Sequence, residues 1–212
     1  MTKRSAQQWN DILVACQVKP IIAAKWSTIF AEVIDDITFS AGDREIDDFL
    51  GQVLHESMGL SRMEEVLSYS ADRIRELGNK SPPGSRWRSL VDKADSIARN
   101  PAAFANACYG GRMGNNTSGD GFKYRGSSLI MVTGKDNFTY LQKITGIPLV
   151  DNPDLLRRPS VEALRVCIAW WEGNVPDSVM GDVRKVTNAV NGGAIGLDDR
   201  QRLTNLADRA LK

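Results

Sequence analysis

The sequence predicts a mainly α fold (α+β) in which a small β-hairpin element lines a cleft. Over most of the 212 residues, apolar side chains recur at the spacing of one helix face. Residues 110–121 are instead rich in glycine, which indicates a long surface loop. Residues 122–132 then alternate and contain β-branched side chains, which favours a short strand or hairpin. The β element therefore falls near the middle of an otherwise helical chain.

The helical segments have ordinary start and stop signals. Pro20 suits a first helical turn, Ser70 and Ser160 are suitable N-caps, and Gly192 follows the end of a later helix. The expected helices are residues 6–17, 20–38, 44–58, 71–78, 85–100, 102–109, 135–144, 160–171, 181–191 and 197–212. With 42% apolar residues, this length suits a single domain over residues 1–212 that begins with N-terminal helices in 1–43.

Composition excludes several classes of protein and site. The single histidine, His55, rules out a two-histidine zinc site, so we expect no metal and no cofactor. The widely spaced Cys16, Cys108 and Cys167 predict core packing rather than a disulfide framework. The net charge of +1 does not suggest nucleic-acid binding. No apolar run reaches the ~20 residues of a membrane span, and the N-terminus does not resemble a signal peptide.

Candidate catalytic groups lie between Phe49 and Ser70. Glu56 falls at the edge of the apolar stripe of the helix 44–58, and Glu64 and Glu65 follow shortly after it. Paired carboxylates across a cleft are the groups that hydrolyse glycosidic bonds. On one continuous helix, residues nine apart would lie ~13.5 Å along the axis and face opposite ways. The chain must therefore turn near Gly59 for Glu56 to act with Glu65, and Glu64 fits the spacing equally well.

Four ordered motifs resemble the compact bacteriophage endolysins of glycoside hydrolase family 19, the chitinase-like lysozymes. They are His55–Leu60 with Glu65, then Tyr109–Asn115 with Gly119–Gly126, then Leu129–Gly134 with Asn137, and finally Val190–Gly193 with Gly196–Arg200. The resemblance covers about residues 45–205. It implies a lysozyme-like fold with a catalytic core in residues 44–205, and no separate wall-binding domain.

The resemblance also implies roles for individual residues. Glu56 matches the general acid, Glu65 the general base of an inverting mechanism, and Thr133 the hydroxyl that helps hold the attacking water. The positions that shape the sugar cleft or order the carboxylates are matched by His55, Tyr124, Asn137, Asn191 and Arg200. An arginine near Glu65 would keep that carboxylate ionised. Taken alone, Asn191 also fits a helix cap, Tyr124 a core aromatic, and Arg200 a surface residue.

The chain departs from the family pattern in one motif and beside Glu65. Where the family has RGRGLIQ, residues 125–131 read RGSSLIM, so Ser127, Ser128 and Met131 replace an arginine, a glycine and a sugar-contacting glutamine. A thioether donates no hydrogen bond, so Met131 cannot make that contact. Val66 stands where the family usually has an asparagine, which leaves the choice between Glu64 and Glu65 open.

These features predict an endolysin that hydrolyses the β-1,4 glycosidic bonds of bacterial peptidoglycan for host cell lysis. The alternatives are a chitinase, and a non-catalytic wall-binding relative, which the changes at residues 127, 128 and 131 motivate. The expected partner is the peptidoglycan glycan strand, without nucleic acid or stable membrane insertion. We expect a monomer that is made in the host bacterial cytoplasm and acts on the periplasmic cell wall after release.

Overall fold

The computed structural model describes residues 3–212. The α-helices are α1 (Ala6–Ala15), α2 (Pro20–Val33), α3 (Ile46–Glu56), α4 (Ala71–Lys80), α5 (Ala94–Ile97), α6 (Pro101–Tyr109), α7 (Asp120–Lys123), α8 (Lys135–Thr145), α9 (Val161–Asn174), α10 (Val183–Asn191) and α11 (Leu197–Leu211). Short 3₁₀ helices cover Gly42–Glu45, Arg88–Lys93, Pro153–Arg157 and Asp177–Val179. The mainly helical, lysozyme-like fold class is therefore confirmed. No helix of this part of the chain is long and apolar enough to cross a membrane.

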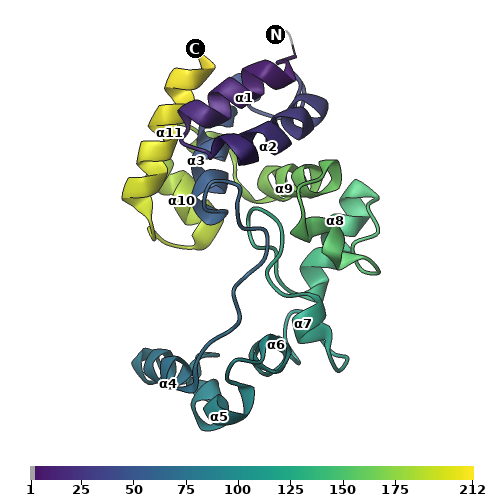
Figure 1. Cartoon of the computed structure of the whole chain (residues 1–212), viewed down its shortest axis with the longest axis vertical. Coiled ribbons are helices and arrows are strands. Elements are labelled where there is room, and N and C mark those ends of the chain that lie inside the picture. Colours follow the sequence, from purple (N-terminus) through teal and green to yellow (C-terminus); the bar gives the residue numbers. More distant parts are fainter. Residues whose placement is uncertain (1–2) are drawn as a thin grey trace.

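The helices form a large and a small lobe, each with its own hydrophobic core (Figure 1). In the large lobe, α1, α2, α3, α8, α9 and α11 share a core that includes Trp9, Trp26 and Trp171. In the small lobe, α4, α5 and α6 enclose a core around Ile74 and Phe104. Residues 57–70 and 110–134 connect the two lobes (Figure 1). These connecting segments hold most of the residues that the sequence singled out.

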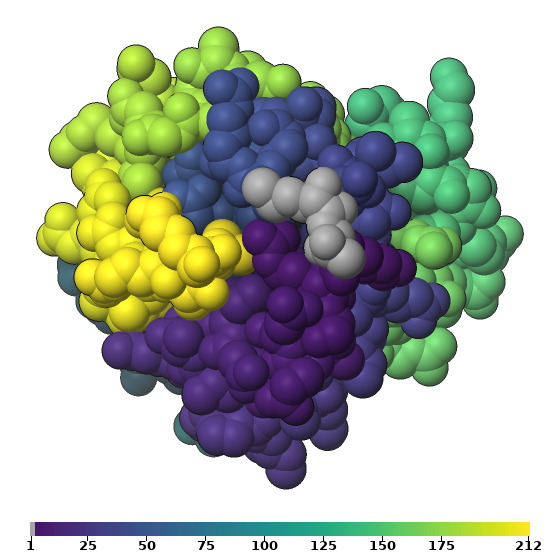
Figure 2. Space-filling model, turned by 90° about the horizontal axis from the view of Figure 1, so that it is seen from above, coloured from purple at the N-terminus to yellow at the C-terminus, as the bar shows by residue number. Residues whose placement is uncertain are grey.

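The N-terminal helices belong to the large lobe. Trp9 of α1 and Phe30 of α2 are fully buried, with ring centroids 5.1 Å apart. Figure 2 shows α1 and α2 in purple beside the yellow C-terminal helix α11 on one face of the molecule. Residues 3–43 therefore complete the hydrophobic core on which α3 packs.

The predicted β-hairpin at residues 122–132 is wrong. Residues 120–123 form the short helix α7, and pairing is limited to two isolated antiparallel bridges, Glu64 with Ser127 and Ser127 with Val132. Ser128 and Met131 have left-handed backbone angles, with φ of 73° and 56°. Such angles turn the chain sharply, so the pairing cannot extend into a ladder.

Two expected helices are shorter than their apolar pattern suggested. Helix α2 ends at Val33 because the Asp35 side chain accepts a hydrogen bond from the Ile37 amide, and the Thr38 hydroxyl accepts one from the Asp35 amide. Such side-chain bonds stabilise turns in competition with helix. Residues 85–100 divide into a 3₁₀ helix and α5, where the carbonyl of Trp87 packs closely against Gly78 of α4. The three cysteines are free and buried, as expected.

Replacing Asp48 of α3 with asparagine should stabilise the protein at neutral pH but not at pH 4. Asp48 is fully buried; one carboxyl oxygen accepts from the Gly181 amide at 2.6 Å, and the other has no partner. Burial raises its pKa to about 6, against about 3.9 in an unfolded chain. Between pH 4 and pH 6 the folded protein keeps the Asp48 proton, whereas the unfolded chain has lost it. The carboxyl therefore destabilises the fold increasingly as pH rises from about 4 to 6.

For Asp48→Asn we expect a gain of about 1–3 kcal/mol in unfolding free energy at pH 7.5. Thermal unfolding of both proteins at pH 4 and pH 7.5 measures it. An equal difference at the two pH values would show that ionisation of Asp48 is not the cause.

Candidate active site

The chain reverses direction directly after Glu56. Helix α3 ends at Glu56, and the next turn is closed by a 2.7 Å hydrogen bond from the Gly59 amide to the Leu54 carbonyl. Met58, Gly59 and Leu60 all have positive φ, of 52°, 66° and 60°. Three consecutive left-handed residues redirect the backbone, so the predicted break near Gly59 is confirmed. The chain then continues without regular secondary structure to Glu64, which forms an isolated bridge, and to Glu65.

Glu56 is held by Arg200 of α11. The Arg200 guanidinium donates to Glu56 Oε1, to Gln52 Oε1 at 2.5 Å and to the Ile195 carbonyl at 3.0 Å. Arg200 is 2% exposed, so this network is shielded from water. Glu56 Oε2 accepts no hydrogen bond from residues 3–212, and the side chain is 23% exposed. One carboxyl oxygen is therefore fixed while the other remains open to a ligand.

Of the two candidate carboxylates, Arg200 pairs with Glu56 rather than with Glu65. The cause lies in the packing of α11 on α3. Gly51 of α3 has no Cβ, and one built there would lie 2.0 Å from the Thr204 hydroxyl. This close approach brings the first turn of α11 over Gln52 and Glu56, which share one face of α3 at i and i+4.

Glu65 is held by the small lobe and by the connecting loop. The Tyr109 hydroxyl of α6 donates to Glu65 Oε2 at 2.7 Å, and the Gly126 amide donates to Oε1 at 2.6 Å. Burial and the neighbouring Glu65 raise the pKa of Tyr109, so this hydroxyl keeps its proton and donates. A carboxylate has about four acceptor positions, so two remain for a water molecule. This placement suits a general base.

Glu64 and Glu65 have different polar partners. Glu64 forms an isolated bridge with Ser127, and the Glu65 amide donates to the Gly126 carbonyl. Arg125 donates from Nε to Glu64 Oε1 at 2.5 Å, whereas Tyr109 and Gly126 contact Glu65. Glu65, which bonds both the small lobe and the connecting loop, therefore stays the candidate partner of Glu56.

Thr133 lies at the start of α8, two extended segments away from Glu65. The Glu65 amide donates to the Gly126 carbonyl, and the next residue, Ser127, is bridged to Val132. The Thr133 hydroxyl donates to the Met131 carbonyl at 2.9 Å, and Asn137 donates to the Thr133 carbonyl at 2.7 Å. The hydroxyl oxygen keeps acceptor capacity for a water, and Asn137 fixes the Thr133 backbone.

His55 and Asn191 support the turn that leads into α11. His55 Nδ1 lies 2.7 Å from Asp199 Oδ2, and a Cβ on Gly196 would meet the His55 ring at 2.4 Å. Asn191 Nδ2 donates to the Ile195 carbonyl at 3.1 Å, and Asn191 Oδ1 accepts from the Gly193 amide. Both residues thus hold the backbone next to Arg200. Their contact with a sugar stays a prediction.

Tyr124 lies in the core of the large lobe. It is 1% exposed, its hydroxyl donates to the Val150 carbonyl at 3.0 Å, and its ring lies 5.3 Å from that of Phe138. This placement leaves no free surface for a sugar. Tyr124 instead fixes the connecting loop, since the Gly134 amide donates to its carbonyl.

Tyr109, Gln52 and Asp199 complete the site and were not assigned roles from the sequence. Tyr109 is the first residue of the motif Tyr109–Asn115, so this motif could have indicated that it belongs to the site. Gln52 precedes Glu56 by one helical turn, which already indicated a shared face. Asp199 lies within the fourth motif, Gly196–Arg200, but its neighbour His55 is 144 positions away.

Ser128→Gly should stabilise the protein without changing its contacts. Ser128 is fully buried in a left-handed conformation with φ of 73°, and its amide donates to the Leu156 carbonyl. Non-glycine residues in such conformations cost ~1–3 kcal/mol, partly offset by the greater chain entropy of glycine. We expect the unfolding free energy, measured by urea unfolding, to rise by about 1 kcal/mol. Ser127→Gly is the control, since Ser127 has no positive φ and its hydroxyl accepts a hydrogen bond from Arg157. This variant should lower the unfolding free energy.

Each lobe thus holds one of the two carboxylates in place. Glu56 is fixed by the large lobe through Arg200, and Glu65 by the small lobe through Tyr109. One carboxyl has an open oxygen and the other is surrounded by donors. Two carboxyl groups held in different surroundings are the kind of pair that hydrolyses glycosidic bonds.

Comparison with known proteins supports the same conclusion. No protein-family model matches the chain. A glycosyl hydrolase family 19 domain-containing protein of Haemophilus influenzae is 34% identical over 157 residues, which cover 73% of this chain and 74% of that protein. Chitinase C from Streptomyces griseus HUT6037 and a mutant of chitinase C each share the fold with a TM-score of 0.53, at 18% and 15% identity, over 98% of this chain and 91% of theirs. The chain therefore belongs to glycosyl hydrolase family 19.

Proposed function

We propose that the protein hydrolyses the β-1,4 glycosidic bonds of bacterial peptidoglycan by an inverting mechanism. The observation that carries the proposal is the pair Glu56 and Glu65, held by different lobes in complementary polar surroundings. The open Oε2 of Glu56 delivers a proton to the glycosidic oxygen as the bond from that oxygen to C1 breaks. Glu65 accepts a proton from a water that attacks C1 from the opposite face. Such a water fits when the carboxyl groups lie about 6.5–9.5 Å apart.

The surrounding residues keep these groups in position. Thr133 accepts a hydrogen bond from the attacking water while its own proton is held by the Met131 carbonyl. Arg200 fixes the acid, and the Tyr109 hydroxyl and Gly126 amide orient the base. No step needs a metal or a cofactor.

The biological role we propose is that of a phage endolysin. Its support is the resemblance of four motifs to the compact family 19 endolysins, together with the family membership. In this role the protein is a monomer, is made in the host cytoplasm, and reaches the periplasmic wall after release.

Chitin is the second candidate substrate, because the fold is that of chitinase C. A non-catalytic wall-binding role is the third candidate. Ser127 and Met131 motivate this candidate. Ser127 is buried against Arg157, and Met131 has no amide group that could contact a sugar.

Digestion of purified peptidoglycan sacculi and of colloidal chitin decides among the three. We expect new reducing ends from sacculi with inverted anomeric configuration in early NMR spectra, and none with Glu56→Gln. Mass spectrometry of the products identifies the sugar at the new reducing end, and therefore the bond that is cut. Release from chitin alone would select the chitinase, and sedimentation with sacculi without new reducing ends the binding protein.

A further inference from the structure

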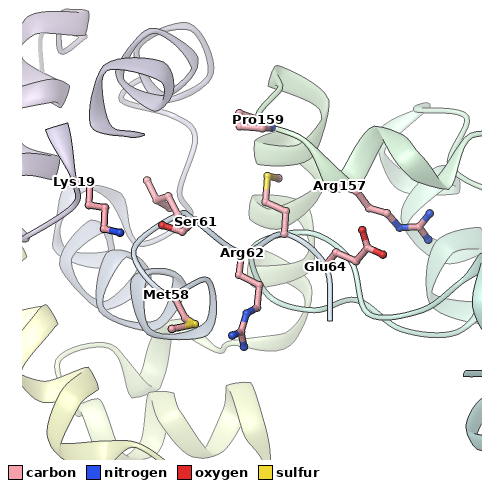
Figure 3. A pocket seen from close by; sticks show the side chains of 9 residues that line it. Lys19, Met58, Ser61, Arg62, Glu64, Arg157 and Pro159 are labelled. Atoms are coloured by element: carbon pink, nitrogen blue, oxygen red, sulfur yellow. The ribbon is translucent and has the colours of Figure 1, made fainter. Parts of the chain in front are cut away.

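A pocket of about 600 Å³ opens on the segment that joins Glu56 to Glu65 (Figure 3). Its lining combines cationic, thioether and carboxylate side chains, namely Lys19, Arg62, Arg157, Met58, Met63 and Glu64. Figure 3 shows Lys19 at one end, Glu64 and Arg157 at the other, and Arg62 between them. Neither Glu56 nor Glu65 lines it, so it is separate from the reaction centre.

The pocket carries two unpaired positive charges. Arg157 is engaged by Asp154, Ser127 Oγ and the Lys123 carbonyl, and Glu64 is engaged by Arg125. In contrast, no carboxylate among residues 3–212 pairs with Lys19 or Arg62. Two free cations around a pocket attract an anionic ligand.

Met58 presents an exposed apolar side chain to the pocket. It is 60% exposed and has a φ of 52°. An exposed large apolar side chain gains little from burial, and its left-handed backbone costs on the order of 1–3 kcal/mol. Met58 also follows Glu56 by only two residues, which ties the pocket to the reaction centre.

The pocket lies next to one of the two candidate catalytic carboxylates. Glu64 lines the pocket while the next residue, Glu65, bonds Tyr109, and consecutive Cα atoms are only about 3.8 Å apart. A four-residue peptide in extended form spans about 13 Å. A side branch on a sugar bound beside Glu65 is therefore long enough to reach the pocket.

We propose that this pocket binds the acidic stem peptide of peptidoglycan, so that the enzyme recognises the peptide branch as well as the glycan strand. The inference rests on the proposed function. Carboxylates of the peptide pair with Lys19 and Arg62, its alanine methyl groups pack on Met58 and Met63, and its free ammonium faces Glu64. Chitin has no such branch, so the pocket sets a preference between the two polymers.

Two measurements test the proposal. The first is calorimetric binding of the synthetic peptide L-alanyl-γ-D-glutamyl-diaminopimelate to the wild type, to Lys19→Ala/Arg62→Ala and to Lys143→Ala. Lys143 is an exposed lysine of α8 outside the pocket, so it is the matched control. The second is the ratio of cleavage rates on peptide-bearing strands and on the same strands stripped of peptide by an amidase.

We expect the double variant to lose peptide binding at least tenfold and its rate ratio to fall towards one, while Lys143→Ala keeps both. A wild type that prefers neither strand, a double variant that binds the peptide normally, or inorganic phosphate binding as tightly as the peptide would overturn the proposal. If the protein is not a glycosidase, it cleaves neither the peptide-bearing strands nor the stripped strands. This outcome differs from the loss of preference that would overturn the pocket proposal. The binding measurement still judges the pocket in that case.

Discussion

Glu65→Gln is expected to lower kcat on peptidoglycan by at least about 100-fold and to leave KM nearly unchanged. The amide has the same shape as the carboxyl, and Tyr109 can still donate to its oxygen, although the amide nitrogen cannot accept the bond that Gly126 donates to Glu65. It cannot take a proton from the attacking water, and general base catalysis is worth about 10²–10⁴ in rate. Initial rates of reducing-end formation measure the loss, and thermal unfolding checks that the fold is kept.

Glu64→Gln is the matched control for this experiment. Glu64 is 43% exposed on its side chain, whereas its partner Arg125 is 10% exposed. Losing this partly exposed ion pair costs on the order of 1 kcal/mol in stability. Loss of a contact in the peptide pocket affects KM, so kcat should stay within about threefold of wild type. The reverse result, with Glu64→Gln inactive and Glu65→Gln active, would make Glu64 the base.

Local rules predicted the parts of the site that depend on neighbouring residues in the chain. The turn near Gly59 followed from helix geometry, since Glu56 and Glu65 cannot face one cleft from a single helix. The caps at Ser70 and Ser160 are likewise formed, because an N-cap is decided within four residues.

Contacts between distant segments were beyond these rules. Arg200 reaches Glu56 rather than Glu65 because α11 crosses α3 where Gly51 meets Thr204, and no local pattern encodes that crossing. Tyr124 was assigned to the cleft by its motif, yet the core of the large lobe encloses it. The hairpin failed for a related reason, since alternation in residues 122–132 does not reveal left-handed angles at Ser128 and Met131.

Arg200→Ala is expected to reduce both stability and activity, because one guanidinium connects the α11 turn to the acid. Its removal leaves Gln52 Oε1 buried without a donor and Glu56 without its cation. Breaking a buried charge pair costs about 3–5 kcal/mol. Glu56 is 23% exposed and gains some water contacts, which places the expected loss in unfolding free energy near 3 kcal/mol. Urea unfolding measures this loss, and kcat should fall at least about tenfold as Glu56 loses its fixed position.

Two further variants separate the role of Arg200 from a general effect of charge. Arg209→Ala removes an exposed arginine from the same helix and should change unfolding free energy by less than about 0.5 kcal/mol, with full activity. Arg200→Lys keeps the charge, but an ammonium cannot reproduce the fixed fork that meets Gln52, Glu56 and the Ile195 carbonyl together. It should therefore recover part of the stability and little of kcat. Full recovery of kcat by lysine would mean that charge alone matters, and that Arg200 does not position the acid.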